Sequence, residues 1–266
     1  MKFNEHIAVA TNKVLLVPYD ARHVPRYHEW MEDATIREAT ASERLALDEE
    51  YANQVEWREA ADKLTFILCE PLTPASGGGG GVGGDGDGDA VVAGEADEPR
   101  RMVGDVNMFL TPWEGDGDDE GLDGSGSGKA HCCMAEIDIM IADPRHRGKG
   151  LGRAAVAALL SFFCRNREGV LAEYGGADGY TSNTGSGKST LVVKDLVAKI
   201  SAGNTGSIAL FKSLGFEQRG GVNYFGEIQM VLEGVGEERD EAPWVAVVKD
   251  AGYKELRYDR SRLREE

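Results

Sequence analysis

The sequence predicts an α/β fold built on a mixed, mostly antiparallel sheet, and three observations support this prediction. Residues 134–141 alternate between polar and apolar side chains, as a strand with one buried face does. A glycine-rich turn and an amphipathic helical pattern follow this strand directly. Two further strand patterns, at 64–69 and 102–110, are expected to pair as a hairpin. Together these patterns indicate a sheet flanked by helices.

The elements that precede the central strand (134–141) are short. A strand at 14–17 ends where Pro18 interrupts it. A helix is expected over 24–31, and a second one over 48–63 behind a segment of capping residues. The second helix is predicted from apolar residues that recur at roughly helical spacing, which are Leu47, Tyr51, Val55 and Trp57.

After the central strand, Asp143-Pro144 ends the ladder, because proline cannot donate to it and restricts the residue before it. A long helix is expected from near Gly150 to near Arg165. Gly215 suits the position just past the end of a later helix. The later elements are predicted as a strand at 196–200, a helix at 204–214 and a closing hairpin of 216–219 with 224–233.

The net charge of −17 over 266 residues is concentrated in two glycine-rich segments, 75–98 and 113–128. Each segment holds six acidic residues and no lysine or arginine. Such segments bury too little apolar surface to become ordered. We therefore predict a domain over 1–233 with disordered insertions near 74–99, 113–129 and 167–190, and a charged tail at 234–266 that an apolar patch allows to dock back.

Composition also restricts partners and location. The scaffold outside the two acidic segments is mildly acidic, which argues against nucleic acid as the main partner. The chain shows no apolar stretch of signal or membrane-span length, so no membrane partner is expected. Its four cysteines have no zinc spacing and include an adjacent pair, Cys132-Cys133. We expect reduced thiols, no metal, and a cytoplasmic or nuclear location.

The turn after the central strand has the features of a phosphate site. Glycines let the backbone approach an anion closely, and the free N–H groups of a helix start face it, helped by the helix dipole. Two overlapping copies of an Arg-x-x-Gly-x-Gly pattern are present, beginning at Arg145 and at Arg147. The residues alone leave open which copy is used, and a plain tight turn is the alternative.

Downstream of another strand, Asn204-x-x-Ser207 precedes Phe211 and Leu214-Gly215-Phe216. This combination resembles the GNAT (GCN5-related N-acetyltransferase) superfamily, in its branch similar to ribosomal-protein N-terminal acetyltransferases. The segments 24–31, 64–67, 103–110 and 135–152 resemble the N-acetyltransferase 9-like family of eukaryotes more closely. The resemblance covers roughly residues 12–233 outside the insertions, and implies a twisted sheet of about six or seven strands with about four helices.

The resemblance also implies a cofactor and its site. It favours Arg147 as the first motif residue, and acetyl-CoA as the co-substrate whose pyrophosphate lies on the loop. The sheet is expected to splay near 140–142, where backbone groups would pair with the pantetheine arm. The residues expected to bind the cofactor are Met140, Ile141, Ala142, Arg147, Gly148, Lys149, Gly150, Leu151, Gly152, Arg153 and Asn204.

The catalytic residues carry over less completely. Many relatives place a tyrosine acid where this chain has Phe211, and some place a glutamate where it has Lys199. Glu136 on the central strand is the candidate general base, and Asp138 on the same strand face is the reserve. The alternative for both is a carboxylate that merely faces a wet cleft. Positioning and backbone N–H groups could supply much of the rate instead.

Several other features have plainer interpretations. Residues 182–189 resemble a P-loop but have Ser182 where glycine is required. The Asp-Gly runs lack the twelfth-position glutamate of a calcium loop. Tyr27, His28 and Trp30 could border an acceptor groove, with core packing favoured for Trp30.

The sequence therefore predicts an acetyl-CoA-dependent N-acetyltransferase. The resemblance implies a protein or peptide N-terminus as the acceptor amine, with tubulin as one example. The alternatives are a lysine or small-molecule amine acetyltransferase, and a non-catalytic acetyl-CoA-binding protein with a regulatory role.

Overall fold

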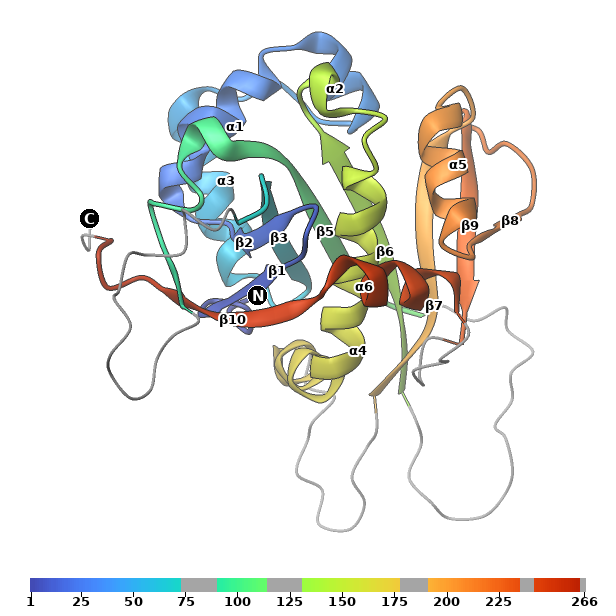
Figure 1. Ribbon diagram of the computed structural model, residues 1–266. Coiled ribbons are helices and arrows are strands. Elements are labelled where there is room, and N and C mark those ends of the chain that lie inside the picture. Colours follow the sequence, from blue (N-terminus) through green and yellow to red (C-terminus); the bar gives the residue numbers. More distant parts are fainter. Residues whose placement is uncertain (73–89, 114–130, 178–190, 235–241, 264–266) are drawn as a thin grey trace.

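The structure is a computed structural model that describes residues 1–72, 90–113, 131–177, 191–234 and 242–263 (Figure 1). Its described strands form one ten-stranded sheet in the order β4-β10-β1-β2-β3-β5-β6-β7-β9-β8. The pairing is antiparallel except between β6 and β7 and between β10 and β4. The mixed, mostly antiparallel α/β fold is therefore confirmed, with more strands than the six or seven predicted.

The strands are β1 (Ile7–Ala10), β2 (Leu15–Pro18), β3 (Lys63–Cys69), β4 (Ala90–Val92), β5 (Met102–Pro112), β6 (His131–Ile141), β7 (Leu191–Ser201), β8 (Glu217–Arg219), β9 (Glu227–Glu233) and β10 (Lys254–Asp259). The helices are α1 (Val24–Met31), α2 (Ala34–Ala39), α3 (Leu47–Glu59), α4 (Leu151–Ala177), α5 (Thr205–Ser213) and α6 (Pro243–Ala251).

Helices cover both faces of the sheet. The long helix α4 lies across one face together with α5 and α6, whose apolar side chains share one core cluster with it (Figure 1). α1 and α2 pack on the opposite face, in a second cluster that includes Trp30, Ile36 and Met140. α3 lies on this second face as well, where Trp57 makes an edge-to-face contact with Phe109 of β5. β3 and most of β5 are thus buried on both sides, whereas β6 alternates between buried and more exposed residues.

Most of the predicted pairings are confirmed. β3 pairs antiparallel with β5, as the hairpin prediction requires, and β8 pairs antiparallel with β9. α5 ends at Ser213 and is followed by Gly215 with a φ of +98°, the left-handed conformation expected at its position. The strand at 134–141 and the helix after it are β6 and α4.

The sheet splays at the carboxyl ends of β6 and β7. Their parallel pairing begins at His131 and Leu191 and ends at Glu136 and Val197, although both strands continue. The separation therefore begins earlier than the expected 140–142. Beyond Glu136, one edge of β6 has no strand partner within the described parts of the chain, and Figure 1 shows β7, β9 and α5 standing apart from β6 at this end.

Two segments expected to be disordered are partly ordered. The helix predicted to end near Arg165 continues to Ala177, because Val170, Leu171 and Tyr174 are buried on its inner side. Residues 90–99 were expected to lie in an acidic insertion, but β4 pairs with β10 and Asp97 is fully buried. The rest of the three insertions lies outside the described residues, as do the P-loop-like 182–189 and both Asp-Gly runs.

The tail predicted at 234–266 docks back through its apolar patch, and it also forms regular structure that was not predicted. Residues 243–259 form α6, which packs on α4, and β10, which pairs antiparallel with β1. Trp244, Val248 and Tyr258 are buried and provide the apolar contacts that hold this segment in place. The segment thus extends the sheet beyond β1.

The orientation of α3 also differs from the prediction. Its expected inner residues Leu47, Tyr51 and Val55 are exposed at 42%, 37% and 51%. Glu50 and Gln54 are buried in their place, and the Gln54 amide donates to the Tyr19 carbonyl at 2.8 Å. The helix also ends at Glu59 rather than near residue 63. Polar partners on the sheet side, which the pattern of apolar residues does not report, decided the orientation.

None of the helices within the described ranges has the length and apolar character needed to span a membrane.

Candidate active site

A cavity of about 550 Å³ opens where the sheet splays. Its walls come from α2, the carboxyl end of β6, the loop and first turn of α4, and α5. Of the residues predicted to bind the cofactor, the cavity is lined by Met140, Ile141, Arg147, Gly148, Gly150, Leu151, Gly152, Arg153 and Asn204. Two predicted residues, Ala142 and Lys149, are not among the lining residues, and Ala142 is buried.

The loop before α4 exposes backbone N–H groups to this cavity. Gly148 and Gly150 have φ values of +70° and +80°, which residues with a side chain rarely adopt. The Gly150 carbonyl accepts the bond from Ala154 N–H at 3.0 Å, so the helix begins there. The amides of Leu151, Gly152 and Arg153 therefore have no acceptor within the helix. Free amides and the dipole at a helix start favour an anion, which fits the predicted phosphate site.

Arg147 fastens this loop to the end of β6. Its Nε donates to the Ile141 carbonyl at 2.9 Å, and its Nη2 donates to the Ala142 carbonyl at 3.3 Å. Arg145, the first residue of the other motif copy, is instead paired with Asp143 on the surface, with 2.6 Å between Nη2 and Oδ2. Arg147 lines the cavity and Arg145 does not. The copy that begins at Arg147 thus forms the loop wall.

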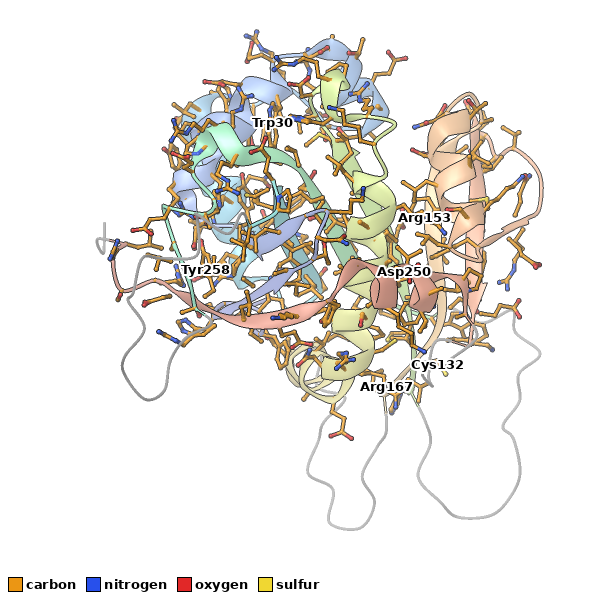
Figure 2. All side chains as sticks on the ribbon, in the orientation of Figure 1. Trp30, Cys132, Arg153, Arg167, Asp250 and Tyr258 are labelled. Atoms are coloured by element: carbon orange, nitrogen blue, oxygen red, sulfur yellow. The ribbon has the colours of Figure 1, made fainter. Side chains whose placement is uncertain are left out.

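α5 closes the cavity from the other half of the sheet. The Asn204 side chain caps this helix by accepting from the Ser207 N–H at 3.1 Å. A Cβ on Gly152 would lie 2.8 Å from Cδ1 of Leu210, so a side chain there would force the Leu210 side chain of α5 to move. Arg153 extends from the first turn of α4 at the side on which α5 lies (Figure 2).

Sequence reasoning missed part of the wall. Thr35, Ile36, Ala39 and Thr40 of α2 line the cavity on the side of the sheet opposite to α5. This helix has six residues, too few for a periodic pattern. Its one local signal is Asp33, whose side chain accepts from the Thr35 N–H at 2.8 Å as an N-cap.

Two carboxylates stand on β6 where its pairing with β7 ends, Glu136 at the last pair and Asp138 beyond it, on the sheet face that Met140 shares. Glu136 is paired with Lys199 of β7, with 2.6 Å between Oε2 and Nζ. Partial burial raises the pKa of Asp138 to about 6, and the charge of Glu136 adds to the effect. Neither carboxylate lines the cavity, but Met140, two residues after Asp138, does.

A second pair of polar residues lies next to these carboxylates on β5. Asp105 and Asn107 are 3% and 4% exposed. Asn107 is opposite Asp138 in the ladder, and its Nδ2 donates to Asp105 Oδ2 at 2.7 Å. Burial raises the pKa of Asp105 to about 7. The sequence signal was available in these two polar residues within an apolar strand, but sequence reasoning assigned them no role.

Three other residues that the sequence singled out, Phe211, Cys133 and Trp30, lie in the protein interior. Phe211 is buried against Phe216, with ring centroids 5.0 Å apart, and cannot donate a proton. Burial raises the pKa of the Cys133 thiol to about 12, which keeps it from acting as a nucleophile. Trp30 is buried, as core packing requires, while the Tyr27 hydroxyl hydrogen-bonds to Asp105.

The model of the acetyltransferase (GNAT) domain family matches residues 13–217. The chain belongs to the GNAT acetyltransferase family. Two relatives of this GNAT protein extend the match beyond the domain. It is 34% identical over 235 residues to an N-acetyltransferase 9-like protein of Caenorhabditis briggsae, covering 88% of this chain and 89% of that one. It is 36% identical over 234 residues to the human alpha/beta-tubulin-N-acetyltransferase 9, covering 87% and 86%.

A solved structure shows the same fold. A ribosomal L7/L12 alpha-N-protein acetyltransferase in complex with coenzyme A superposes with a TM-score of 0.50 at 11% identity, covering 86% of this GNAT chain and 98% of that one. Family and fold agree, and the protein is therefore an N-acetyltransferase.

Proposed function

We propose that this enzyme transfers the acetyl group of acetyl-CoA to the α-amino group of a protein N-terminus. The observation that carries the proposal is the cavity itself. It joins a helix start to an edge of β6 that has no strand partner among the described residues, and Asp138, whose pKa is raised, lies on β6 two residues before Met140 of the cavity wall.

The residues present fit acetyl-CoA. The amides of Leu151, Gly152 and Arg153 would hold the pyrophosphate, with no side chain at Gly150 to obstruct it. The edge of β6 at 139–141 would pair with the amide groups of the pantetheine arm. Bound acetyl-CoA would supply the acetyl group: a nitrogen–carbon bond forms as the carbon–sulfur bond breaks, and the sulfur leaves as a thiol by taking up one proton.

The acceptor side of the sheet is acidic. Glu136, Asp138 and Glu227 act on one another electrostatically, and Lys199 is the cation in the group. Such a surface attracts a protonated amine. Before the amine can attack, it must lose a proton, and in our proposal Asp138 accepts that proton. Glu136 is less suited to this role, because Lys199 occupies one of its oxygens.

An α-amino group loses its proton more easily than a lysine, whichever base accepts that proton. An α-amino group titrates near 8 and a lysine near 10.4. Against a base with a pKa of about 6, removing the proton costs about 3 kcal/mol for the first and about 6 kcal/mol for the second. A difference of about 3 kcal/mol corresponds to roughly a hundredfold in rate. N-termini are therefore the better acceptors for this site.

The relatives named alpha/beta-tubulin-N-acetyltransferase 9 support tubulin N-termini as the first protein acceptors to test. The part of the chain that the structure describes contains no disulfide, which supports a cytoplasmic or nuclear place of action.

The proposal is tested by offering peptides that differ only in which amine is free. Calorimetric titration with acetyl-CoA should give one site per chain, and mass spectrometry should find acetyl groups on N-termini. Acetylation confined to lysines of N-terminally blocked peptides would instead support a lysine acetyltransferase. Binding without any transfer would support a non-catalytic protein.

The role of Asp138 predicts a pH dependence. Because the ionised carboxylate is the base, kcat/KM should rise as the pH increases through about 6. Asp138→Asn should lower kcat/KM by about 10²–10⁴-fold and abolish this rise with pH. Glu136→Gln is the matched comparison and should cost less. If Glu136→Gln removes the rise of kcat/KM with pH and Asp138→Asn keeps it, Glu136 is the base.

A further inference from the structure

Asp105 and Asn107 extend the chemistry of the β6 carboxylates into the protein interior. In the β5–β6 ladder, Asn107 is opposite Asp138 and Asp105 is opposite Met140. Side chains directly opposite each other across such a ladder are about 5 Å apart at Cβ, and diagonal neighbours such as Asp105 and Asp138 are about 7–8 Å apart. Asn107 is therefore a ladder neighbour of Asp138 and the next residue on the same face of β5 as Asp105.

Two buried oxygens without a donor indicate that the Asp105 carboxyl carries a proton. Its Oδ2 accepts from the Asn107 amide at 2.7 Å, and this bond and the interaction with the Tyr27 hydroxyl lower the pKa of Asp105 and oppose the effect of burial. The other oxygen, Oδ1, is buried, as is Asn107 Oδ1, and neither has a donor among the described residues. An ionised carboxylate can only accept hydrogen bonds. A protonated Asp105 has one O–H donor, so a proton relieves the shortage of donors around these two oxygens.

The charges around Asp105 favour the same state. Tyr27 faces it from α1, Tyr19 from the segment before α1, and Asp138 from β6. Glu50 of α3 acts on both tyrosines. None of these groups is a cation. Burial raises the pKa of Asp105 to about 7, and the charge of Asp138 raises it further than burial alone would.

We propose that Asp105 and Asp138, diagonal neighbours across the β5–β6 ladder, are one coupled carboxyl pair in which Asp105 is a positioning residue for Asp138. This inference rests on the proposed role of Asp138 as proton acceptor. While Asp105 holds its proton, Asp138 ionises readily and can accept a proton from the amine. Once Asp105 is ionised, its charge makes Asp138 hold a proton more strongly. The two carboxyls then titrate as a pair.

The coupling can be measured without substrate. Carbon-13 labelling of the aspartate carboxyls, followed by NMR titration of the free protein, gives the apparent pKa of Asp105 directly. Asp138→Asn should lower this value by about 1 unit, because it removes the neighbouring charge. An unchanged Asp105 titration overturns the inference. Since no acetyl transfer is involved, this result is independent of whether the proposed function holds.

The effect on catalysis is tested with Asp105→Asn, which keeps the shape of the side chain. Wild-type kcat/KM should show ionisations near 6 and 7, and the variant should retain the first and lose the second. The acceptor amine titrates identically in both proteins and cancels in the comparison. Glu50→Gln, which changes another buried carboxyl, is the matched control and should keep both ionisations. An equal loss of activity at every pH in Asp105→Asn overturns the inference and shows a structural role.

Discussion

At the scale of single residues, the glycines of the α4 loop determine what can approach the helix start. Gly148 and Gly150 have left-handed backbone conformations, and a Cβ on either would meet no atom within 4 Å. The space beside them therefore belongs to the cavity rather than to packing. A side chain added there would occupy the position proposed for the pyrophosphate.

Gly150→Glu should weaken acetyl-CoA binding by about tenfold or more, because it places a carboxylate among the amides that face the anion. Calorimetric titration measures the change. Gly220→Glu is the matched control, since Gly220 also has a positive φ, of +74°, and open space around it, but lies outside the cavity. Equal weakening in both variants would show that backbone strain, and not charge at the loop, is responsible.

At the scale of elements, β10 is held in the sheet by a buried polar cluster. The Tyr258 hydroxyl donates to Asp97 and accepts from Arg22 Nη2 at 2.7 Å. Arg22 is ion-paired with Asp97, and His23 Nε2 lies 3.3 Å from the same carboxylate. The cluster joins the segment before α1, the turn after β4 and β10, on which Figure 2 labels Tyr258.

Breaking this cluster should loosen β10. Asp97→Ala should lower the free energy of unfolding by about 3–5 kcal/mol, because it leaves the buried side of Arg22 without its carboxylate. Arg262→Ala is the control, since Arg262 is 67% exposed and its pair with Glu95 should contribute only about 0–1 kcal/mol. Urea denaturation measures both. A cost below about 1 kcal/mol for Asp97→Ala would show that β10 does not depend on the cluster.

The central strand and its loop could be predicted because their signals are local. Alternation over 134–141 and the glycines at 148–152 specify a strand, a turn and a helix without reference to the rest of the chain. β1, β4, β10 and α2 have three to six residues each, and contacts with distant segments stabilise them. Local patterns cannot report such contacts, and α3 was assigned the wrong inner face for the same reason.

The candidate site divides in the same way. The loop residues could be predicted from the Arg-x-x-Gly-x-Gly motif, and Asn204 from the Asn-x-x-Ser motif at the start of α5. The α2 wall and the Asp105–Asn107 pair depend on which strands are neighbours, which only the assembled sheet determines. The number of acidic residues in 75–98 predicted disorder, but at Asp97 this was misleading. That carboxylate is buried among cationic and hydroxyl partners.

At the scale of the whole molecule, the cavity lies between two halves of one sheet, and a ligand bound there touches both. Saturation with acetyl-CoA at about 100 times its Kd should stabilise the folded state by about 3 kcal/mol. The unfolding temperature should rise by about 5–10 °C, as measured by scanning calorimetry. At the same acetyl-CoA concentration, Gly150→Glu should reduce this rise to about half or less, because its binding is about tenfold weaker or more, and Gly220→Glu should keep it. An undiminished rise in both variants would place the ligand elsewhere.

The pairing of β1 with β10 also has a consequence for synthesis of the chain. Ile7 is paired with Arg257, so the first strand waits for a partner made near the other end of the sequence. At roughly 5–20 residues per second, ribosomes need on the order of ten seconds or more to reach it. During that time one edge of β1 is open to pairing with other chains. Successful folding in the cell therefore requires this edge to be protected until residue 259 has emerged.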